Sequence, residues 1–119
     1  MKLFHAHAYF KADDLREADH LARLARTEDY FKFVKLYEKP IGPHPTGMVE
    51  LHFDEPAHNS AVKWIEAHRG PMSVLVHEET GDDVRDHTEG IQWLGPKVSL
   101  DFGFFELIKS RPDLRVHKP

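Results

Sequence analysis

The sequence predicts an α+β domain in which an antiparallel sheet carries helices on one face. Hydrophobic residues alternate with other residues in Leu3–Phe10 and again in 48–53, which is the period of a strand with one apolar face. After each of these segments, apolar residues recur every three or four positions, as in an amphipathic helix. Because 119 residues suffice for one core and not for two, residues 1–119 are expected to form a single domain.

The first half of the chain is predicted as strand, helix and two further strands. Leu3–Phe10 (LFHAHAYF) is followed by two aspartates at 13–14, which suit a helix start. The helix itself is indicated by apolar residues at helical spacing, namely Leu15, Ala18, Leu21, Ala22 and Ala25. Aromatic, lysine and aliphatic residues alternate as a second strand at 31–37. Residues 39–45 hold three prolines and one glycine, so we expect a stiff connection into the third strand.

The second half is predicted as helix, strand and a C-terminal extension. Asp54 can cap a helix that runs to the Gly-Pro stop signal at 70–71. Residues 72–77 (MSVLVH) alternate as a fourth strand. In the extension we expect a polar loop or helical turn at 80–88 and a helix at the apolar stretch 102–108.

This order of elements is the split βαββαβ unit of the ferredoxin-like fold. We expect the first and third strands to lie side by side and parallel in the centre, with both helices on one face. The opposite face then collects the imidazoles of several strands and one carboxylate, from His5, His7, Glu50, His52 and His77. Because Leu3, Met48 and Leu75 share this face, we expect a partner subunit or the C-terminal segment to cover it, and we predict a homodimer.

Composition and charge exclude several classes of function. The formal net charge is −4 and the basic residues are scattered, which argues against nucleic acid as a partner. The chain has no cysteine, so disulfides, thiolate metal sites and a cysteine nucleophile are excluded. Neither a signal peptide nor a membrane span is visible, and we therefore expect a cytoplasmic protein without a membrane partner.

Two imidazoles two residues apart on the first strand are the most informative feature of the chain. A strand with one apolar face normally turns Lys, Thr or Glu to solvent, so imidazoles at these positions call for a reason. Metal binding is the obvious one. His5, Glu50 and His52 are the predicted metal ligands, with His77 as a substitute. Glu50 could instead orient a histidine beside the metal.

Three ordered blocks, each with a histidine, resemble a known family. FHAHAYF, GPHPTGMVELHF and SVLVHEETGDDVRDHT, followed by WLG, are similar to the DOPA 4,5-dioxygenase family over residues 3–95. The resemblance implies oxygen-dependent cleavage of a catechol ring beside its two hydroxyls, with 3,4-dihydroxyphenylalanine or a related catechol as substrate. The family's histidines fall on His5, His7, His44, His52, His77 and His87.

Extradiol cleavage gives each of these residue types a task. It needs non-haem Fe(II) with open positions for the catechol and O2, and His with carboxylate leaves such positions open. Zn or Mn could occupy the site in the purified protein. An imidazole that titrates near neutral pH suits the acid and base steps, for which we select His7, His44 and His87. The predicted substrate-binding residues are Tyr9, Lys35 and Arg85, the last two for a substrate carboxylate.

Other interpretations of the same residues remain open. The chain could be a non-catalytic ferredoxin-like module that dimerises and binds a small ligand or structural Zn2+, or a metal-dependent isomerase or hydrolase. We interpret four further histidines as surface or helix residues, namely His20, His58, His68 and His117. Trp64 and Trp93 are expected in the core, and the acids at 82, 83 and 86 in a solvated loop or at a helix N-terminus.

Overall fold

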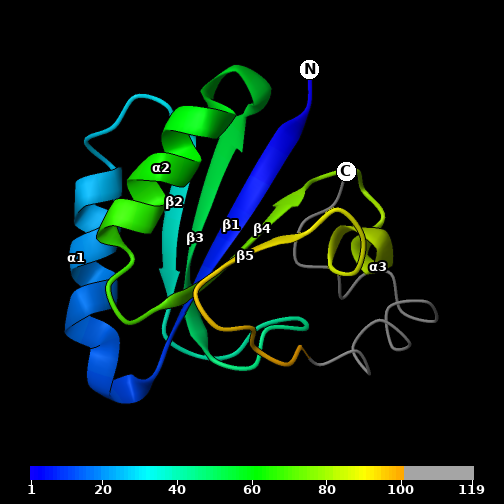
Figure 1. Ribbon diagram of the computed structural model, residues 1–119. Helices are drawn as coiled ribbons and strands as arrows, with labels where there is room; N and C mark the ends of the chain where they lie inside the picture. The colour runs from blue at the N-terminus through cyan, green and yellow to red at the C-terminus, as the bar shows by residue number, and fades with distance from the viewer. Residues whose placement is uncertain (101–119) are drawn as a thin grey trace.

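A computed structural model describes residues 1–100, which form a five-stranded antiparallel sheet with two helices packed on one face (Figure 1). The elements are β1 (Leu3–Phe10), a 3-10 turn (Ala12–Asp14), α1 (Leu15–Ala25), β2 (Phe33–Tyr37), β3 (Gly47–Asp54), a second 3-10 turn (Glu55–Ala57), α2 (His58–His68), β4 (Ser73–Glu78), α3 (Asp83–Asp86) and β5 (Gln92–Leu94). The α+β class and the helical turn expected within 80–88 are confirmed. The helix expected at 102–108 lies outside the described residues.

The sheet has the strand order β2-β3-β1-β4-β5, so β1 lies in its centre. The first four strands have the ferredoxin-like order, as predicted. The prediction that the first and third strands run parallel is wrong, because β1 pairs with β3 in antiparallel register. The crossover through α1 makes β1 and β2 parallel, and the hairpin connection from β2 to β3 then reverses the direction of β3.

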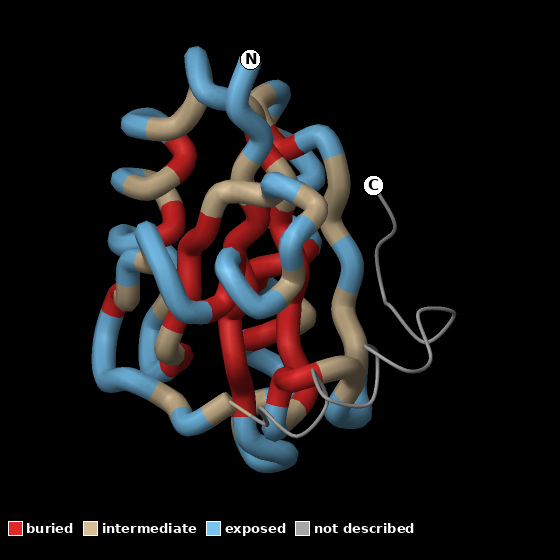
Figure 2. The backbone as a smooth tube through the Cα atoms, turned by 90° about the vertical axis from the view of Figure 1, so that its right-hand side faces the viewer, coloured by how far each residue is buried: buried red, intermediate tan, exposed pale blue. Residues whose placement is uncertain are grey.

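The main core lies between the sheet and the two long helices. The apolar face of β1 contributes Ala6 and Ala8, and both are fully buried. These small residues let α1 and α2 pack closely on the central strand. From α1 the predicted stripe of Ala18, Leu21, Ala22 and Ala25 is buried against them. Figure 2 shows this burial as a continuous band along the central strands.

The start of the second strand differs from the prediction by two residues. β2 begins at Phe33 and not at residue 31. Phe31 instead turns into the core, where its ring lies edge-on against Phe53 and Trp64. Trp64 is therefore a core residue, as expected. Asp54 accepts a hydrogen bond from the backbone N–H of Ala57 at 3.2 Å and caps the turn that leads into α2, also as predicted.

The other face of the sheet is covered by the chain itself. Tyr9, Met48 and Leu75 are buried there in a second hydrophobic cluster. Partly buried residues of the 37–41 and 91–100 segments pack against it, namely Tyr37, Ile41, Ile91, Trp93, Val98 and Leu100. Of the three apolar residues for which a partner subunit was expected, Met48 and Leu75 are fully buried in one chain, whereas Leu3 is exposed. The homodimer stays a prediction.

Within residues 1–100, no helix is both long and apolar enough to cross a bilayer.

Candidate active site

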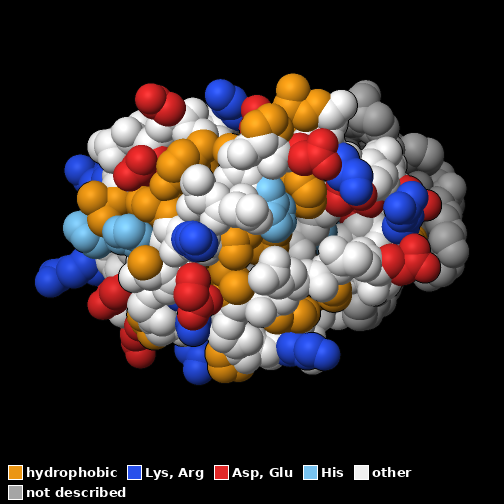
Figure 3. All heavy atoms as spheres, turned by 45° about the horizontal axis from the view of Figure 1, so that its top comes forward, with side chains coloured by type: hydrophobic (Ala, Val, Ile, Leu, Met, Phe, Trp, Pro, Cys, Tyr) orange, Lys and Arg blue, Asp and Glu red, His pale blue; other side chains and the backbone are white. Residues whose placement is uncertain are grey.

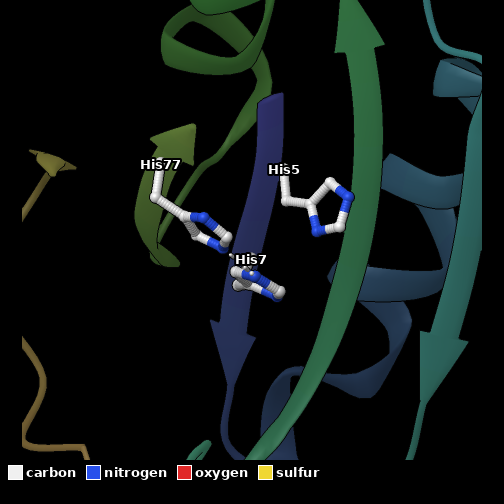
Figure 4. Close-up of side chains that lie close together, drawn as sticks. All are labelled: His5, His7 and His77. Carbon is white, nitrogen blue, oxygen red and sulfur yellow. Dashed lines mark hydrogen bonds between the residues drawn. The ribbon is translucent and has the colours of Figure 1, made fainter. Parts of the chain in front are cut away.

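The covered sheet face brings all the predicted histidines together. β1 carries His5 and His7, and its register places His5 between His52 of β3 and His77 of β4. The ladder also places Glu50 opposite His7. Figure 4 shows the rings of His5 and His7 on the β3 side of β1, with His77 reaching from β4 toward His7. Two residues outside the sheet complete the cluster, His44 from the proline-rich loop and His87 from the end of α3.

His7 is the centre of this cluster. The ring centroid of His7 lies 4.2 Å from that of His44, 5.0 Å from that of His77 and 5.9 Å from that of His87. His5 lies on the other side of His7, with its ring at 6.2 Å. All five imidazoles are buried, and the Glu50 carboxylate beside them is fully buried. Burying five imidazoles and a carboxylate together in a small domain costs free energy. This cost indicates that the cluster has a function beyond packing.

The hydrogen bonds of the rings fix their tautomers. His77 Nδ1 lies 3.0 Å from the carbonyl oxygen of Glu78, and His87 Nδ1 lies 2.7 Å from that of Asp83. A carbonyl oxygen only accepts, so both Nδ1 atoms carry the hydrogen and both Nε2 atoms keep a lone pair. His7 Nε2 therefore donates to His77 Nε2, which lies 2.9 Å away (Figure 4).

Burial keeps the central imidazoles neutral. It lowers the pKa of His7 well below its usual value, and the neighbouring imidazoles, first that of His44, lower it further. Burial and the His87 ring lower the pKa of His77 to about 4. Burial also lowers the pKa of His87. Neutral imidazoles offer their lone pairs to a proton or to a metal ion at physiological pH.

The polar end of the cluster is formed by His5, His52 and Glu79. The His5 and His52 rings are stacked face to face, with centroids 3.6 Å apart and planes inclined by 4°, and Phe33 continues the stack at 4.3 Å from His52. His5 Nδ1 lies 3.2 Å from Glu79 Oε2. The side chains of His52 and Glu79 are 22% and 21% exposed, respectively. Solvent reaches the cluster from this end of the sheet, where imidazole atoms appear at the surface among hydrophobic side chains (Figure 3).

Two acids of this region were not predicted as site residues. Burial raises the pKa of Glu79 to about 7, and a hydrogen bond from the backbone N–H of Gly81 partly opposes this. Asp86 was expected in a solvated loop or at a helix N-terminus, but it is buried and accepts hydrogen bonds from the N–H and hydroxyl of Thr80. The sequence offered no periodic signal for either, because Glu79 follows β4 in an irregular segment and Asp86 ends the four-residue helix α3, which is too short to show a period.

Within residues 1–100, four sets of three residues could each hold a metal ion. In every set, one ligand atom per residue lies within 4.8 Å of those of the other two. The predicted metal ligands His5, Glu50 and His52 form one set, and the predicted acid–base residues His7, His44 and His87 form another. The remaining sets both contain the predicted substitute ligand, and they are His5–His7–His77 and His77–Glu79–Asp86.

The predicted substrate-binding residues are dispersed. Lys35 is exposed on the edge strand, where it is paired in register with Glu50 and has its Nζ 4.9 Å from the centre of the Tyr37 ring. Arg85 is exposed on α3, with Nε 3.8 Å from Glu89. Tyr9 is buried, and its hydroxyl is hydrogen-bonded to His44 at 2.6 Å. Of the three, Tyr9 contacts the imidazole cluster directly, through this hydrogen bond to His44.

The remaining histidines and Trp93 lie as expected where the structure describes them. His20 and His68 are exposed, and His58 packs against Phe4 with ring centroids 4.7 Å apart. Trp93 packs on the second hydrophobic cluster. His117 lies outside the described residues.

Comparison with known proteins agrees with the resemblance of the three sequence blocks. A sequence model of the Dopa 4,5-dioxygenase family matches residues 4–104. An uncharacterized 21.2 kDa protein of Botryotinia fuckeliana is 33% identical over 97 residues, covering 75% of this chain and 53% of the relative. The DOPA 4,5-dioxygenase of Amanita muscaria is 32% identical over 111 residues, covering 85% of this chain and 48% of the relative. The chain thus spans about half the length of these curated relatives.

A solved structure is similar over almost the whole chain. The crystal structure of a "putative dioxygenase" from Nostoc punctiforme superimposes with a TM-score of 0.76 and is 35% identical in sequence. The match covers 91% of this chain and 94% of the other.

Proposed function

This chain belongs to the Dopa 4,5-dioxygenase family, and from that premise we propose that it opens the ring of a catechol with molecular oxygen at a non-haem Fe(II) ion. The catechol would be 3,4-dihydroxyphenylalanine or a close relative. The observation that carries the proposal is the group of buried, neutral imidazoles around His7. A covered sheet face with several metal-ligating side chains and one open end suits a small planar substrate.

The residues that best suit the metal are His7, His44 and His87. Their ligand atoms lie within 4.8 Å of one another, and two nitrogens bound to one ion lie at most about 4.2 Å apart, so modest ring rotations suffice. The Nδ1 atoms of His44 and His87 are held by Tyr9 and by a backbone carbonyl. His7 Nδ1 lies 3.5 Å from Glu50 Oε1. Metal-binding histidines commonly have such an outer partner on the second nitrogen.

The predicted set of His5, Glu50 and His52 has the composition of a two-histidine, one-carboxylate iron site but a less suitable geometry. The lone pair of an imidazole nitrogen lies in the plane of the ring. Since the His5 and His52 rings are stacked with planes only 4° apart, their lone pairs do not converge on one point without rotation of a ring. We therefore propose His7–His44–His87 as the metal set, and we assign His5 and His52, together with Glu79, to the polar end of the site that solvent reaches.

When bound, Fe(II) supplies a redox-active centre that both catechol oxygens and O2 can reach. The protein's own part is to accept and return a proton. His77 is the group we assign to this task, because its Nδ1–H is held by the Glu78 carbonyl and its Nε2 lone pair faces the cluster. With the ring hydrogen of His7 on Nδ1, beside Glu50 Oε1, His7 Nε2 would be available to hold the metal. His77 Nε2 would then no longer accept a hydrogen from His7 and could accept a catechol proton instead.

The test is anaerobic loading of the purified protein with Fe(II), followed by addition of 3,4-dihydroxyphenylalanine and air. We expect oxygen uptake together with a yellow ring-opened product, and neither with the Zn(II)-loaded protein. Turnover by the Zn(II) form equal to that of the Fe(II) form would refute dioxygenase chemistry. Binding of catechol with no oxygen uptake would favour the non-catalytic module.

Variants distinguish the two metal sets. His44→Ala should lose most of the bound metal, whereas His52→Ala should keep it. His20→Ala, on the exposed face of α1, is the matched control and should behave as the parent protein. The opposite result, with metal lost in His52→Ala and kept in His44→Ala, would return the ion to His5, Glu50 and His52.

A further inference from the structure

Tyr9 connects strand β1 to the loop that carries His44 through a side-chain hydrogen bond. It is two residues after His7 on the same face of β1, and its ring is buried in the second hydrophobic cluster with Met48 and Leu75. Its hydroxyl lies 2.6 Å from His44 Nδ1, which is a short and buried hydrogen bond. The Tyr9 ring is thus held by hydrophobic packing, and its hydroxyl is held by the hydrogen bond to His44.

The backbone around His44 does not fix the direction of its side chain. Pro43 and Pro45 flank His44 and donate no backbone N–H, so this stretch cannot be held by a strand ladder. The backbone N–H of His44 donates to the carbonyl of Ile41 at 3.1 Å, which defines a turn and not the direction of the side chain. The direction of the imidazole is left to its side-chain contacts.

The bond to Tyr9 also selects a ring nitrogen. When His44 Nδ1 carries the ring hydrogen and donates it to the hydroxyl oxygen of Tyr9, Nε2 keeps the lone pair that a metal ion needs. The His44 ring lies 4.2 Å from that of His7 and 5.3 Å from that of His87.

We propose that Tyr9 is a positioning residue that orients His44 and selects its Nε2 as the metal ligand. The proposal rests on the proposed function. It replaces a direct contact with substrate, which was the prediction for Tyr9, because the side chain is 4% exposed and its hydroxyl is already engaged. Outer partners of this kind typically change metal affinity by about 10–100-fold when removed.

The experiment compares two Tyr→Phe variants by metal affinity. Tyr37 is the matched control, because it is on the same face of the sheet and packs on the same hydrophobic cluster, yet it lies on the edge strand β2. The dissociation constant for Co(II) is measured by titration calorimetry of the metal-free protein, and the visible Co(II) spectrum is recorded. We expect Tyr9→Phe to weaken binding by about 10-fold or more and to alter the spectrum, and Tyr37→Phe to do neither.

A double variant separates positioning from loss of structure. In a His44→Ala background, Tyr9→Phe should not weaken Co(II) binding further, because the residue through which it acts is gone. Additive losses would overturn the proposal, as would unchanged affinity of the single variant. Absence of Co(II) binding by the parent protein would instead refute the proposed metal site itself, so the two failures are distinguishable.

Discussion

Replacement of two neighbouring residues on β3 should have very different effects on stability. Leu51 is fully buried between the sheet and the helices, and it pairs with Ala6 on one side and Val34 on the other. His52, the next residue, points to the opposite face, and its side chain is 22% exposed. The two side chains differ in environment although their backbones are adjacent.

Leu51→Ala should therefore destabilise the protein strongly. The change removes three buried carbon atoms, and the neighbouring strands leave little room for collapse, so the expected loss is about 2–5 kcal/mol. For a domain of this size, about 3 kcal/mol corresponds to a fall in Tm of roughly 10 °C. His52→Ala mainly removes ring stacking with His5 and Phe33, and we expect it to cost about 1 kcal/mol.

Urea unfolding followed by circular dichroism measures both values, and metal content of the folded fraction is determined in parallel. Folded Leu51→Ala should keep its metal in full. Equal destabilisation by the two variants, or a larger loss from His52→Ala, would refute the assignment of residues 51 and 52 to opposite faces. The whole grouping of imidazoles on one face would fail with it.

Two further predictions concern the pH dependence of stability and the buried carboxylate of Asp86. Acidifying the metal-free protein from pH 7 to pH 5 should lower its stability to urea. The buried imidazoles have pKa values below that of an unfolded histidine, so the unfolded chain takes up protons first, from about pH 6.5 down to about pH 4 for His77. Glu79 has a raised pKa of about 7, so its protonation stabilises the folded protein over part of the same pH range. The loss of stability on acidification should therefore be steeper in Glu79→Gln. A stability that does not change with pH in either protein would contradict this account. Asp86→Ala should cost about 1–3 kcal/mol in the same assay, because the buried carboxylate accepts two hydrogen bonds from Thr80, whereas a change below 0.5 kcal/mol would show that water replaces them.

Much of the fold follows from periodicity, and the reason is visible in β1. Alternation of side chains is a local property of an extended backbone, so His5 and His7 had to lie on one face and Ala6 and Ala8 on the other. The same argument placed Glu50 and His52 together on β3. The spacing of the apolar residues of α1 likewise predicted its buried stripe.

The remaining features depend on contacts between distant segments. The direction of β3 relative to β1 is set by the crossover and the hairpin, which alternation does not report. Tautomers depend on which carbonyl lies beside each ring, as for His77 and the oxygen of Glu78. Asp86 was expected to be solvated because nothing in the adjacent sequence indicates that the segment around Thr80 folds over it and donates hydrogen bonds to it. The choice between two metal sets also needed the ring planes, since composition alone favoured His5 and His52.

The central place of β1 has a consequence for synthesis of the protein. The ribosome makes this strand first, yet both of its partners, β3 and β4, come from later parts of the chain. A nascent chain that ends before residue 73 exposes one edge of β1, and with it a row of imidazoles without their β4 neighbour. The site is therefore assembled only when nearly the whole domain has left the ribosome. An ion that binds several of these imidazoles at once would bind the fully folded protein in preference to incomplete chains, and would stabilise it against unfolding.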